Sequence, residues 1–528
     1  MLIDGRSLDG QTIEADLCIC GGGAAGIALA LEMRSLGISV VLLESGDVEL
    51  DEQTQQLAEA ENTSFVDFPV ETTRLRYLGG TTNHWGGFTY PFSEFDMTPR
   101  AYSGNTTWPI AHADLAKYYP AAGVLCELGR MAYEEVDGWQ TRAGFTPLRM
   151  PQGPMQTAVG QFSPPTRFGT AYRQQLDQAA SVKVLLNSNV QELIASDDAS
   201  RVERARVACL GGASFNVTAK VFVVALGGIE TARLLLLSRG QQTAGLGNGQ
   251  DLVGRHYADH CGFTGGEVRF AAPDAMGFFT DFHTVNDSLL YGLFTPRTEV
   301  LQRENIGNFR IQLFPRLAVP GIDSLHALRE EPSRLGEHLG NILVDLDQVS
   351  DLIYKNLLHK KFGLLKGVPS RTSIISGAIM HISAEQVPNS ESRVMLSEQR
   401  DVFGQQKVNL HWRIQEGDRR TMLRGYELFA DAFSLAGLGR VRVPSELRTG
   451  DLDRMMEIAC HHSGTTRMSD SERAGVVDAN CRVHSTSNLY IASSAVFPTY
   501  SWVNPTLTIV ALTLRLADHL KQQAWSHA

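Results

Sequence analysis

The sequence predicts an α/β protein, with a Rossmann-like dinucleotide-binding domain and a second domain built on a sheet. Three observations predict it: a strand, glycine turn and helix near the N-terminus, strand-like alternation through much of the second half, and a final strand and helix. With 528 residues and 57.9 kDa, the chain exceeds what one hydrophobic core usually organises. We expect residues 1–260 and 456–528 to form the nucleotide domain and residues 261–455 the second domain.

The first element is a dinucleotide fingerprint. An apolar strand over 16–20 leads into the turn Gly21-Gly-Gly-Ala-Ala-Gly26 and an apolar helix. In such a turn the first glycine allows the tight bend, the second lets backbone amides approach a pyrophosphate, and the third lets the helix pack on the strand. The alternative is an ordinary tight strand-to-helix turn, but the strand, glycine turn, helix, second strand and terminal acid together favour the fingerprint. The residues expected at the pyrophosphate are Gly21, Gly23, Ala24, Ala25 and Gly26.

The second strand, over 38–44, ends on Glu44, followed by Ser45. Glu44 lies eighteen residues beyond Gly26, where a carboxylate accepts hydrogen bonds from a ribose diol and repels a 2′-phosphate. The pattern therefore favours an unphosphorylated adenosine ribose.

A loop-rich segment, 71–180, follows. Residues 71–119 are rich in Gly, Thr, Pro and aromatic residues, and ordered loops of this length are usually functional. We expect the segment to cover part of the cofactor and substrate site. Within it, residues 163–169 form either part of a pocket wall or a rigid turn.

Nucleotide-domain strands return at 181–190 and at 222–226, where the turn with Gly227 leads into a helix over 232–238. Strand-like alternation at 392–397 and 407–412, followed by a helix over 417–435, predicts the second sheet.

Apolar residues recur at helical spacing from Leu339 to Leu357 and predict an amphipathic helix over about 335–360. That helix either packs on the sheet or acts as a lid or subunit contact. The final helix, over 504–519, is expected to begin at Asn504 with Pro505 in its first turn, which directs backbone amides at whatever lies in front of them.

Composition excludes several classes of protein. The formal charge is −11, from 47 basic and 58 acidic residues, and no long basic cluster points to nucleic acid. No apolar run approaches a membrane span, so we expect a soluble, cytoplasmic protein. The seven cysteines form no Cys-x-x-Cys pair, which predicts reduced core thiols without disulfides or structural zinc, and excludes a fused c-type haem.

In their order along nearly the whole chain, these segments resemble the glucose-methanol-choline (GMC) family of FAD-dependent oxidoreductases. The resemblance implies FAD as cofactor and an architecture of the GMC and p-hydroxybenzoate hydroxylase type. The motifs that carry it are the glycine turn with Glu44, Leu78-Gly-Gly-Thr-Thr-Asn-His-Trp-Gly-Gly87, Val223-Val-Ala-Leu-Gly-Gly228, Asp251-Leu-Val-Gly-Arg-His-Tyr-Ala-Asp-His260, His461-His-Ser-Gly-Thr-Thr-Arg-Met468 and Asn504-Pro-Thr-Leu-Thr508.

By the same resemblance, residues 79–87 lie near the isoalloxazine and Val190 near the adenine. The segment Asn83-His84-Trp85 is similar to one in pyranose 2-oxidases where the histidine is covalently attached to the flavin, although other members keep His-Trp without that bond. The residues expected around FAD are Gly21, Gly23, Ala24, Ala25, Gly26, Glu44, Ser45, Gly79, Gly80, Asn83, His84, Trp85, Gly86, Val190, Ala225, Gly227, Ala495, Asn504, Pro505 and Thr506.

His461 occupies the position of the family's catalytic base, and Asn504 that of its partner. An imidazole with a pKa near neutrality suits removal of a hydroxyl proton, and an amide can hold the substrate oxygen as negative charge develops. The family implies hydride transfer to flavin N5. A one-residue slip would move the base to His462, which we otherwise expect to be structural, as are His260 and Arg467.

The Asn-His-Trp segment and the His/Asn pair lean toward pyranose 2-oxidase, glucoside 3-dehydrogenase and C-glycoside oxidase members. A secondary hydroxyl of a sugar or glycoside, at C2 or C3, is the leading substrate. The alternatives are an aromatic or aliphatic alcohol, including a natural-product intermediate, and a non-oxidising flavoprotein of lyase type. Oxygen, a quinone and a redox protein all remain open as electron acceptor.

Overall fold

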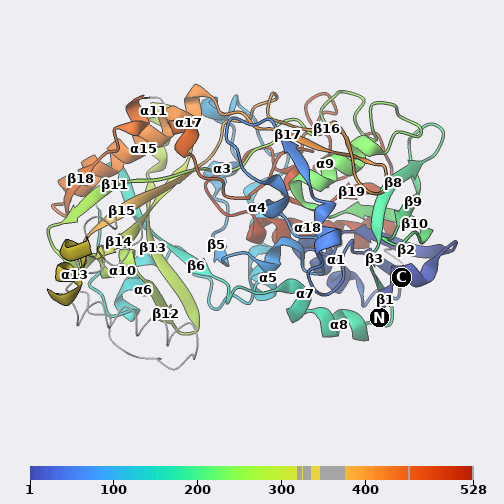
Figure 1. Cartoon of the computed structure of the whole chain (residues 1–528), viewed down its shortest axis with the longest axis horizontal. Helices are drawn as coiled ribbons and strands as arrows, with labels where there is room; N and C mark the ends of the chain where they lie inside the picture. Colours follow the sequence, from blue (N-terminus) through green and yellow to red (C-terminus); the bar gives the residue numbers. More distant parts are fainter. Residues whose placement is uncertain (151–152, 318–323, 325–334, 345–374, 450–451, 526–528) are drawn as a thin grey trace.

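The structure is a computed structural model that describes the chain except residues 151–152, 318–323, 325–334, 345–374, 450–451 and 526–528. Two large sheets lie at opposite ends of the long axis, and both chain termini lie beside the first of them (Figure 1). This arrangement confirms the predicted α/β fold with a nucleotide-binding sheet and a second sheet.

The first sheet has eight strands, and its parallel part is the nucleotide-binding core. All four residues of β3 and the last four of β2 are buried, as expected of parallel strands covered on both faces. Helices α1 (Ala24–Met33) and α18 (Thr506–Ala524) pack together, and α9 (Gly227–Leu237) packs against β8. In order the strands are β1 (Leu2–Asp4), β7 (Val182–Leu186), β3 (Val40–Leu43), β2 (Thr12–Cys20), β10 (Ser214–Val224), β9 (Val202–Ala208) and β8 (Asn189–Ala195), with β19 (Leu489–Ile491) paired to the second half of β10.

The second sheet is antiparallel and also has eight strands. Helix α15 (Glu416–Leu435) packs on one of its faces, where Gly425 lies against the buried side chains of Ile382 and Phe309. In order the strands are β18 (Gly439–Arg442), β11 (Cys261–Phe270), β15 (Ile375–Ala384), β14 (Phe309–Leu317), β13 (Ser288–Pro296), β6 (Met155–Phe162) and β5 (Phe88–Thr89), with β12 (Phe282–Val285) paired to β13. Strands β5 and β6 come from the loop-rich segment, which thus contributes two strands to this sheet.

A small third sheet joins β16 (Arg393–Arg400) and β17 (Gln406–His411) to β4 (Ala60–Asn62). The prediction that the strands at 392–397 and 407–412 belong to the second sheet is therefore wrong, because β17 pairs with β4 from the N-terminal part of the chain. The remaining α-helices are short connectors: α2 (Glu52–Gln56), α3 (Glu94–Met97), α4 (His112–Ala116), α5 (Tyr119–Leu125), α6 (Val136–Arg142), α7 (Phe168–Ala171), α8 (Arg173–Gln178), α10 (Gly277–Thr280), α11 (Thr298–Glu304), α13 (Leu335–Val344), α16 (Glu446–Thr449) and α17 (Leu452–Met455).

The expected long helices occur with shifted boundaries. Helix α15 begins one residue before the predicted start. The sequence predicts Asn504 as the N-terminal cap of α18 and Pro505 as its first helical residue. This is wrong by one position: the carbonyl of Pro505 accepts the first helical hydrogen bond from Ile509, so Pro505 is the cap and the helix begins at Thr506. Helix α13 covers Leu335–Val344 of the predicted 335–360 helix, and positions 345–360 lie outside the described residues.

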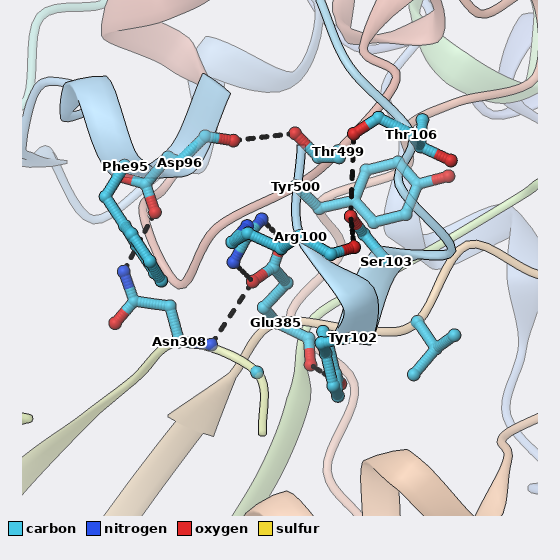
Figure 2. Close-up of polar contacts among 12 residues, drawn as sticks. Phe95, Asp96, Arg100, Tyr102, Ser103, Thr106, Asn308, Glu385, Thr499 and Tyr500 are labelled. Carbon is cyan, nitrogen blue, oxygen red and sulfur yellow. Dashed lines mark hydrogen bonds and ion pairs between the residues drawn. The ribbon is translucent and has the colours of Figure 1, made fainter. Parts of the chain in front are cut away.

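A buried polar clamp joins the two halves of the molecule. Arg100, from the loop after α3, makes two hydrogen bonds of 2.7 and 2.6 Å to Glu385, just beyond β15. Figure 2 shows Asn308, at the start of β14, bonded both to Glu385 and to Asp96, while Thr499 bonds to the Asp96 carbonyl. The clamp therefore fixes β14 and β15 relative to the C-terminal segment that leads to Asn504.

Candidate active site

A cavity of about 640 Å³ runs through the nucleotide domain, a size suited to a large bound ligand. Both Glu44 and His461 line it, so it connects the ribose position predicted from the sequence with the predicted reaction centre. Its wall combines the glycine turn, the 80–87 loop, the start of α9 and the residues before α18.

The glycine turn has the close contacts that the fingerprint requires. Gly21 has φ of +112°, and a Cβ there would lie 2.5 Å from the Ala225 carbonyl oxygen. A Cβ on Gly26 would lie 1.9 Å from the Gly21 carbonyl oxygen, so only glycine lets α1 pack this close to the turn. A Cβ on Gly23 would meet nothing within 4 Å, which leaves its backbone open toward the cavity. The turn and the N-terminus of α1 are thus a fitting cradle for a pyrophosphate.

Glu44 is held as an acceptor at the ribose position. Its carboxylate accepts hydrogen bonds from the backbone N–H groups of Gly22 (2.9 Å) and Gly46 (3.0 Å) and is 5 % exposed. Burial raises its pKa, and the two backbone N–H groups act in the opposite direction. Its remaining acceptor positions suit hydroxyl groups, so this end of the cavity fits the adenosine ribose of FAD.

Most residues predicted around FAD line this one cavity. They are Gly21, Gly23, Ala24, Ala25, Glu44, Ser45, Gly80, His84, Trp85, Gly86, Val190, Ala225, Gly227, Asn504, Pro505 and Thr506.

Four predicted residues do not line the cavity and instead shape its walls. Gly26 makes the close packing just described. Gly79 has φ of +103° and passes close to Gly169, while the Asn83 amide donates to the Leu78 carbonyl 3.0 Å away. Ala495 is fully buried, and its carbonyl accepts from the Thr466 N–H.

Sequence reasoning missed an ionic cluster at the ribose end. Glu230 pairs with Arg74 (2.8 Å) and Arg76 (2.6 Å), and Arg233 pairs with Asp401 (2.6 Å) of the β16–β17 hairpin. All five side chains line the cavity. No local pattern reveals them, because the partners Arg74 and Glu230 are 156 residues apart.

His461 is anchored by its backbone and by a second histidine. The Asp259 carboxylate accepts hydrogen bonds from the backbone N–H groups of His461 and Cys460, each 2.9 Å. Nδ1 of His461 lies 2.8 Å from Nδ1 of His260, and Nε2 of His260 lies 3.5 Å from the Tyr500 carbonyl oxygen. His260, expected to be structural, thus lies in direct contact with the predicted base.

These contacts select one pair of tautomers. The Tyr500 carbonyl can only accept, so the proton of a neutral His260 belongs on Nε2 and its Nδ1 is an acceptor. Nδ1 of His461 then donates, which leaves a lone pair on its Nε2. Burial lowers the pKa of His260 to about 4, and burial, with the neighbouring His260, Arg310 and His462, lowers that of His461 well below 6.5. His461 is therefore neutral at physiological pH and able to accept a proton at Nε2.

Asn504 is oriented by an arginine that the sequence analysis did not single out. Nη1 of Arg310, on β14, donates to Oδ1 of Asn504 at 3.3 Å. Since Oδ1 is engaged there, the N–H donors of the Asn504 amide are left for the cavity that this residue lines. The only signal in the sequence is a charged residue inside the apolar alternation of 309–313.

The neighbouring histidines differ in their surroundings. His462 also lines the cavity, although it is 8 % exposed, and its Nε2 has no partner among the described residues. His84 lines the cavity and its side chain is exposed there. Partial desolvation by the surrounding wall, followed by the charge of Arg167, lowers its pKa.

The remaining candidate groups brace loops. Arg167 donates to the carbonyls of Thr82 and Trp85, so residues 163–169 brace the 80–87 loop as a rigid turn. Arg467 donates to the Ala474 carbonyl and does not line the cavity.

No helix among the described residues is long and apolar enough to cross a membrane. In the same part of the chain, no group of three or more His, Cys, Asp or Glu side chains is arranged to hold a metal ion.

Comparison with known proteins gives consistent results. A family model described as GMC oxidoreductase matches residues 388–513. The chain is 23 % identical to the fructose dehydrogenase large subunit of Gluconobacter japonicus, over 97 % of this chain and 98 % of that one. It is 25 % identical to paromamine 6'-oxidase of Streptomyces fradiae, over 95 % and 90 %. Among solved structures, pyridoxine 4-oxidase from Mesorbium loti has a similar fold, with a TM-score of 0.54 and 15 % identity over 96 % of this chain and 99 % of that one.

Proposed function

This chain belongs to the GMC oxidoreductases, FAD-dependent enzymes that oxidise alcohols, and from that premise we propose that it oxidises a sugar or glycoside. The reacting group is a secondary ring hydroxyl, at C2 or C3, and the product is a keto sugar. The family and the cofactor leave the substrate open, so the substrate class is inferred from the residues at the site.

The observation that carries the proposal is the polar face of the second sheet beside Asn504. Residues directly opposite one another on antiparallel strands share a face, which puts Arg310 beside Ser383, and Gln312 beside His381. Thr264 continues the second row on β11 and lies 3.0 Å from Nδ1 of His381. Such a face offers many hydrogen-bond partners, as recognition of a ring with several hydroxyl groups requires.

Aromatic rings border the same region. The Arg310 guanidinium lies 4.2 Å from the ring centroid of Phe88 and 5.6 Å from that of Trp502. Tyr90 packs on Trp502 with ring centroids 4.8 Å apart. Apolar rings beside a polar face suit a pyranose, which has C–H groups on its faces and hydroxyl groups at its edge.

FAD held in this cavity would supply the acceptor for the hydride that leaves the carbinol carbon. His461 takes the hydroxyl proton at Nε2, and its Nδ1–H donates to His260 throughout. The Asn504 amide donates to the substrate oxygen while that oxygen gains negative charge. The chain has both a histidine that can take the proton and an amide that can hold the oxygen, as alcohol oxidation requires. The presence of this pair disfavours a non-oxidising, lyase-type function.

The test is anaerobic bleaching of the flavin spectrum of the purified holoenzyme. The panel contains free sugars, O- and C-glycosides, aryl alcohols and aliphatic alcohols. Bleaching by glycosides, with a ketone at C2 or C3 in the product, supports the proposal. Bleaching by apolar alcohols alone overturns the sugar assignment and favours the alternative substrate class, and a flavin that no alcohol reduces overturns alcohol oxidation itself.

Two finer features need their own measurements. Reoxidation of the reduced enzyme by oxygen, a quinone or a redox protein, compared by stopped flow, identifies the electron acceptor. Acid precipitation shows whether His84 is covalently attached to the flavin, because an attached flavin stays with the protein pellet.

A further inference from the structure

Arg310 stands apart from the other buried arginines. Four arginines in the described part of the chain are buried, with Arg74 and Arg233 7 % exposed, and Arg100 and Arg310 8 % exposed. Arg74 pairs with Glu230, Arg233 with Asp401 and Arg100 with Glu385. Arg310 has no carboxylate partner among the described residues. A buried charge without a counter-charge is costly, so such a group usually has a function.

The groups in direct contact with the Arg310 guanidinium are uncharged. Its guanidinium lies over Phe88 and near Trp502, and its one hydrogen bond within the described residues is to Asn504. Its Nε is buried and has no hydrogen-bond partner in the part of the chain that the structure describes. Burial alone lowers its pKa to about 10, so the group keeps its charge at neutral pH. The nearby His260 and His461 are also neutral.

The positive charge of Arg310 acts on the two histidines at the predicted reaction centre. It contributes to the lowered pKa values of both His260 and His461. Because Asn504 lines the cavity and is in direct contact with Arg310, the positive charge lies one hydrogen bond from the place where the substrate oxygen would be held. In a dry, aromatic environment such a charge interacts strongly with an anion.

We propose that Arg310 and Asn504 form an oxyanion-binding site beside His461, which takes a small carboxylate in the resting enzyme. A second part of the proposal rests on the proposed function: during turnover the same site stabilises the oxygen of the substrate hydroxyl group as the hydroxyl proton passes to His461. Arg310 keeps its own protons and forms no covalent bond. The site prefers anionic or neutral ligands and disfavours a cationic group near the reacting hydroxyl.

The test is a titration of the holoenzyme with sodium acetate at constant ionic strength, followed by the perturbation of the flavin absorption spectrum. Acetamide, which has nearly the same shape without the charge, is the matched ligand. Wild-type protein is expected to bind acetate with a Kd of about 1 mM and acetamide at least roughly tenfold more weakly, the range expected for a charge-assisted hydrogen bond. Equal binding of the two ligands, or no binding of acetate, overturns the proposal without any variant.

Variants identify the residue responsible. Arg310→Gln keeps a hydrogen-bonding side chain without the charge and is expected to weaken acetate binding roughly tenfold or more, whereas Arg310→Lys, which keeps the charge but not the planar group, should weaken it less. Arg316→Gln is the matched control, because Arg316 lies on the same strand but is exposed and pairs with Glu267. Unchanged acetate affinity in Arg310→Gln overturns the assignment, as does an equal loss in Arg316→Gln.

Because acetate binding needs no turnover, the two proposals can fail separately. If the holoenzyme binds acetate more tightly than acetamide but no glycoside bleaches the flavin, only the sugar assignment is overturned. A glycoside-active enzyme that does not distinguish acetate from acetamide overturns only the oxyanion site.

The charge preference is checked with methyl glucoside, methyl glucuronide and methyl 6-amino-6-deoxyglucoside, which all keep the C2 and C3 hydroxyl groups. Preferential oxidation of the ammonium compound overturns the predicted charge preference.

Discussion

Nδ1 of His461 lies 2.8 Å from Nδ1 of His260, so two imidazole rings share a single proton across this contact. Both rings are neutral near pH 7, because burial lowers both pKa values. The proton between them decides which nitrogen of His461 has the free lone pair. His260 thereby acts as a positioning residue for His461.

Replacing His461 by Ala should leave FAD bound and slow flavin reduction by roughly a hundredfold or more, the effect of a lost general base. Stopped-flow absorbance under anaerobic conditions measures the rate, and the flavin-to-protein absorbance ratio checks cofactor content. His462→Ala is the matched control. If His462→Ala, and not His461→Ala, abolishes reduction, the base is His462.

Replacing His260 separates the positioning role from packing. His260→Asn can still present a carbonyl oxygen to the Nδ1–H of His461, whereas His260→Leu cannot. We expect reduction to slow roughly 10- to 100-fold in His260→Leu, as for other supporting groups, and clearly less in His260→Asn. Equal rates in both variants would show that His260 acts through packing alone.

The pH dependence of flavin reduction follows from the lowered pKa of His461. The base works when deprotonated, so acidification should slow reduction only as the pH falls through its pKa in the folded protein, which lies below the ordinary value of 6.5. The rate constant for reduction should accordingly be flat above pH 6.5. A midpoint at or above 6.5, measured by stopped flow over a pH series, would contradict the assignment.

Arg100→Met should destabilise the protein strongly, because it leaves Glu385, which is fully buried, without its partner. The expected loss is about 3–5 kcal/mol, measured by chemical denaturation at a fixed FAD concentration. Arg130→Met is the control, since the exposed Arg130–Glu135 pair should contribute about 0–1 kcal/mol. The double change of Arg100 and Glu385 to Met should recover much of the loss, and failure to recover it would mean that packing, not the unpaired charge, is responsible.

Glu44→Gln should weaken FAD binding, because the amide offers one acceptor oxygen where the backbone N–H groups of Gly22 and Gly46 now use two. An unsatisfied buried donor costs about 1–3 kcal/mol, or roughly 5- to 150-fold in Kd. Recovery of flavin fluorescence on dilution of the holoenzyme measures this affinity. Affinity equal to that of the wild type would remove Glu44 from the ribose site.

The sequence by itself determined the fold class and the resemblance to the GMC oxidoreductases with their cofactor, and it predicted the roles of the glycine turn, Glu44, His461 and Asn504. It could do so because these features are local: a tight turn needs glycine at fixed spacing, and a catalytic motif is a short run of neighbours. The structure adds that these separate runs line one cavity.

Only the tertiary structure decided which side chains hold the predicted site residues in place. The contacts His260–His461, Arg310–Asn504 and Arg100–Glu385 join residues 201, 194 and 285 positions apart. They depend on the register of β14 against β15 and on the position of the loop after α3, which long-range packing and pairing set. Arg310 shows the physical reason most clearly. The alternation along β14 is visible in the sequence, but the contact of Arg310 with Asn504, and the absence of a paired carboxylate among the described residues, are properties of the folded chain alone.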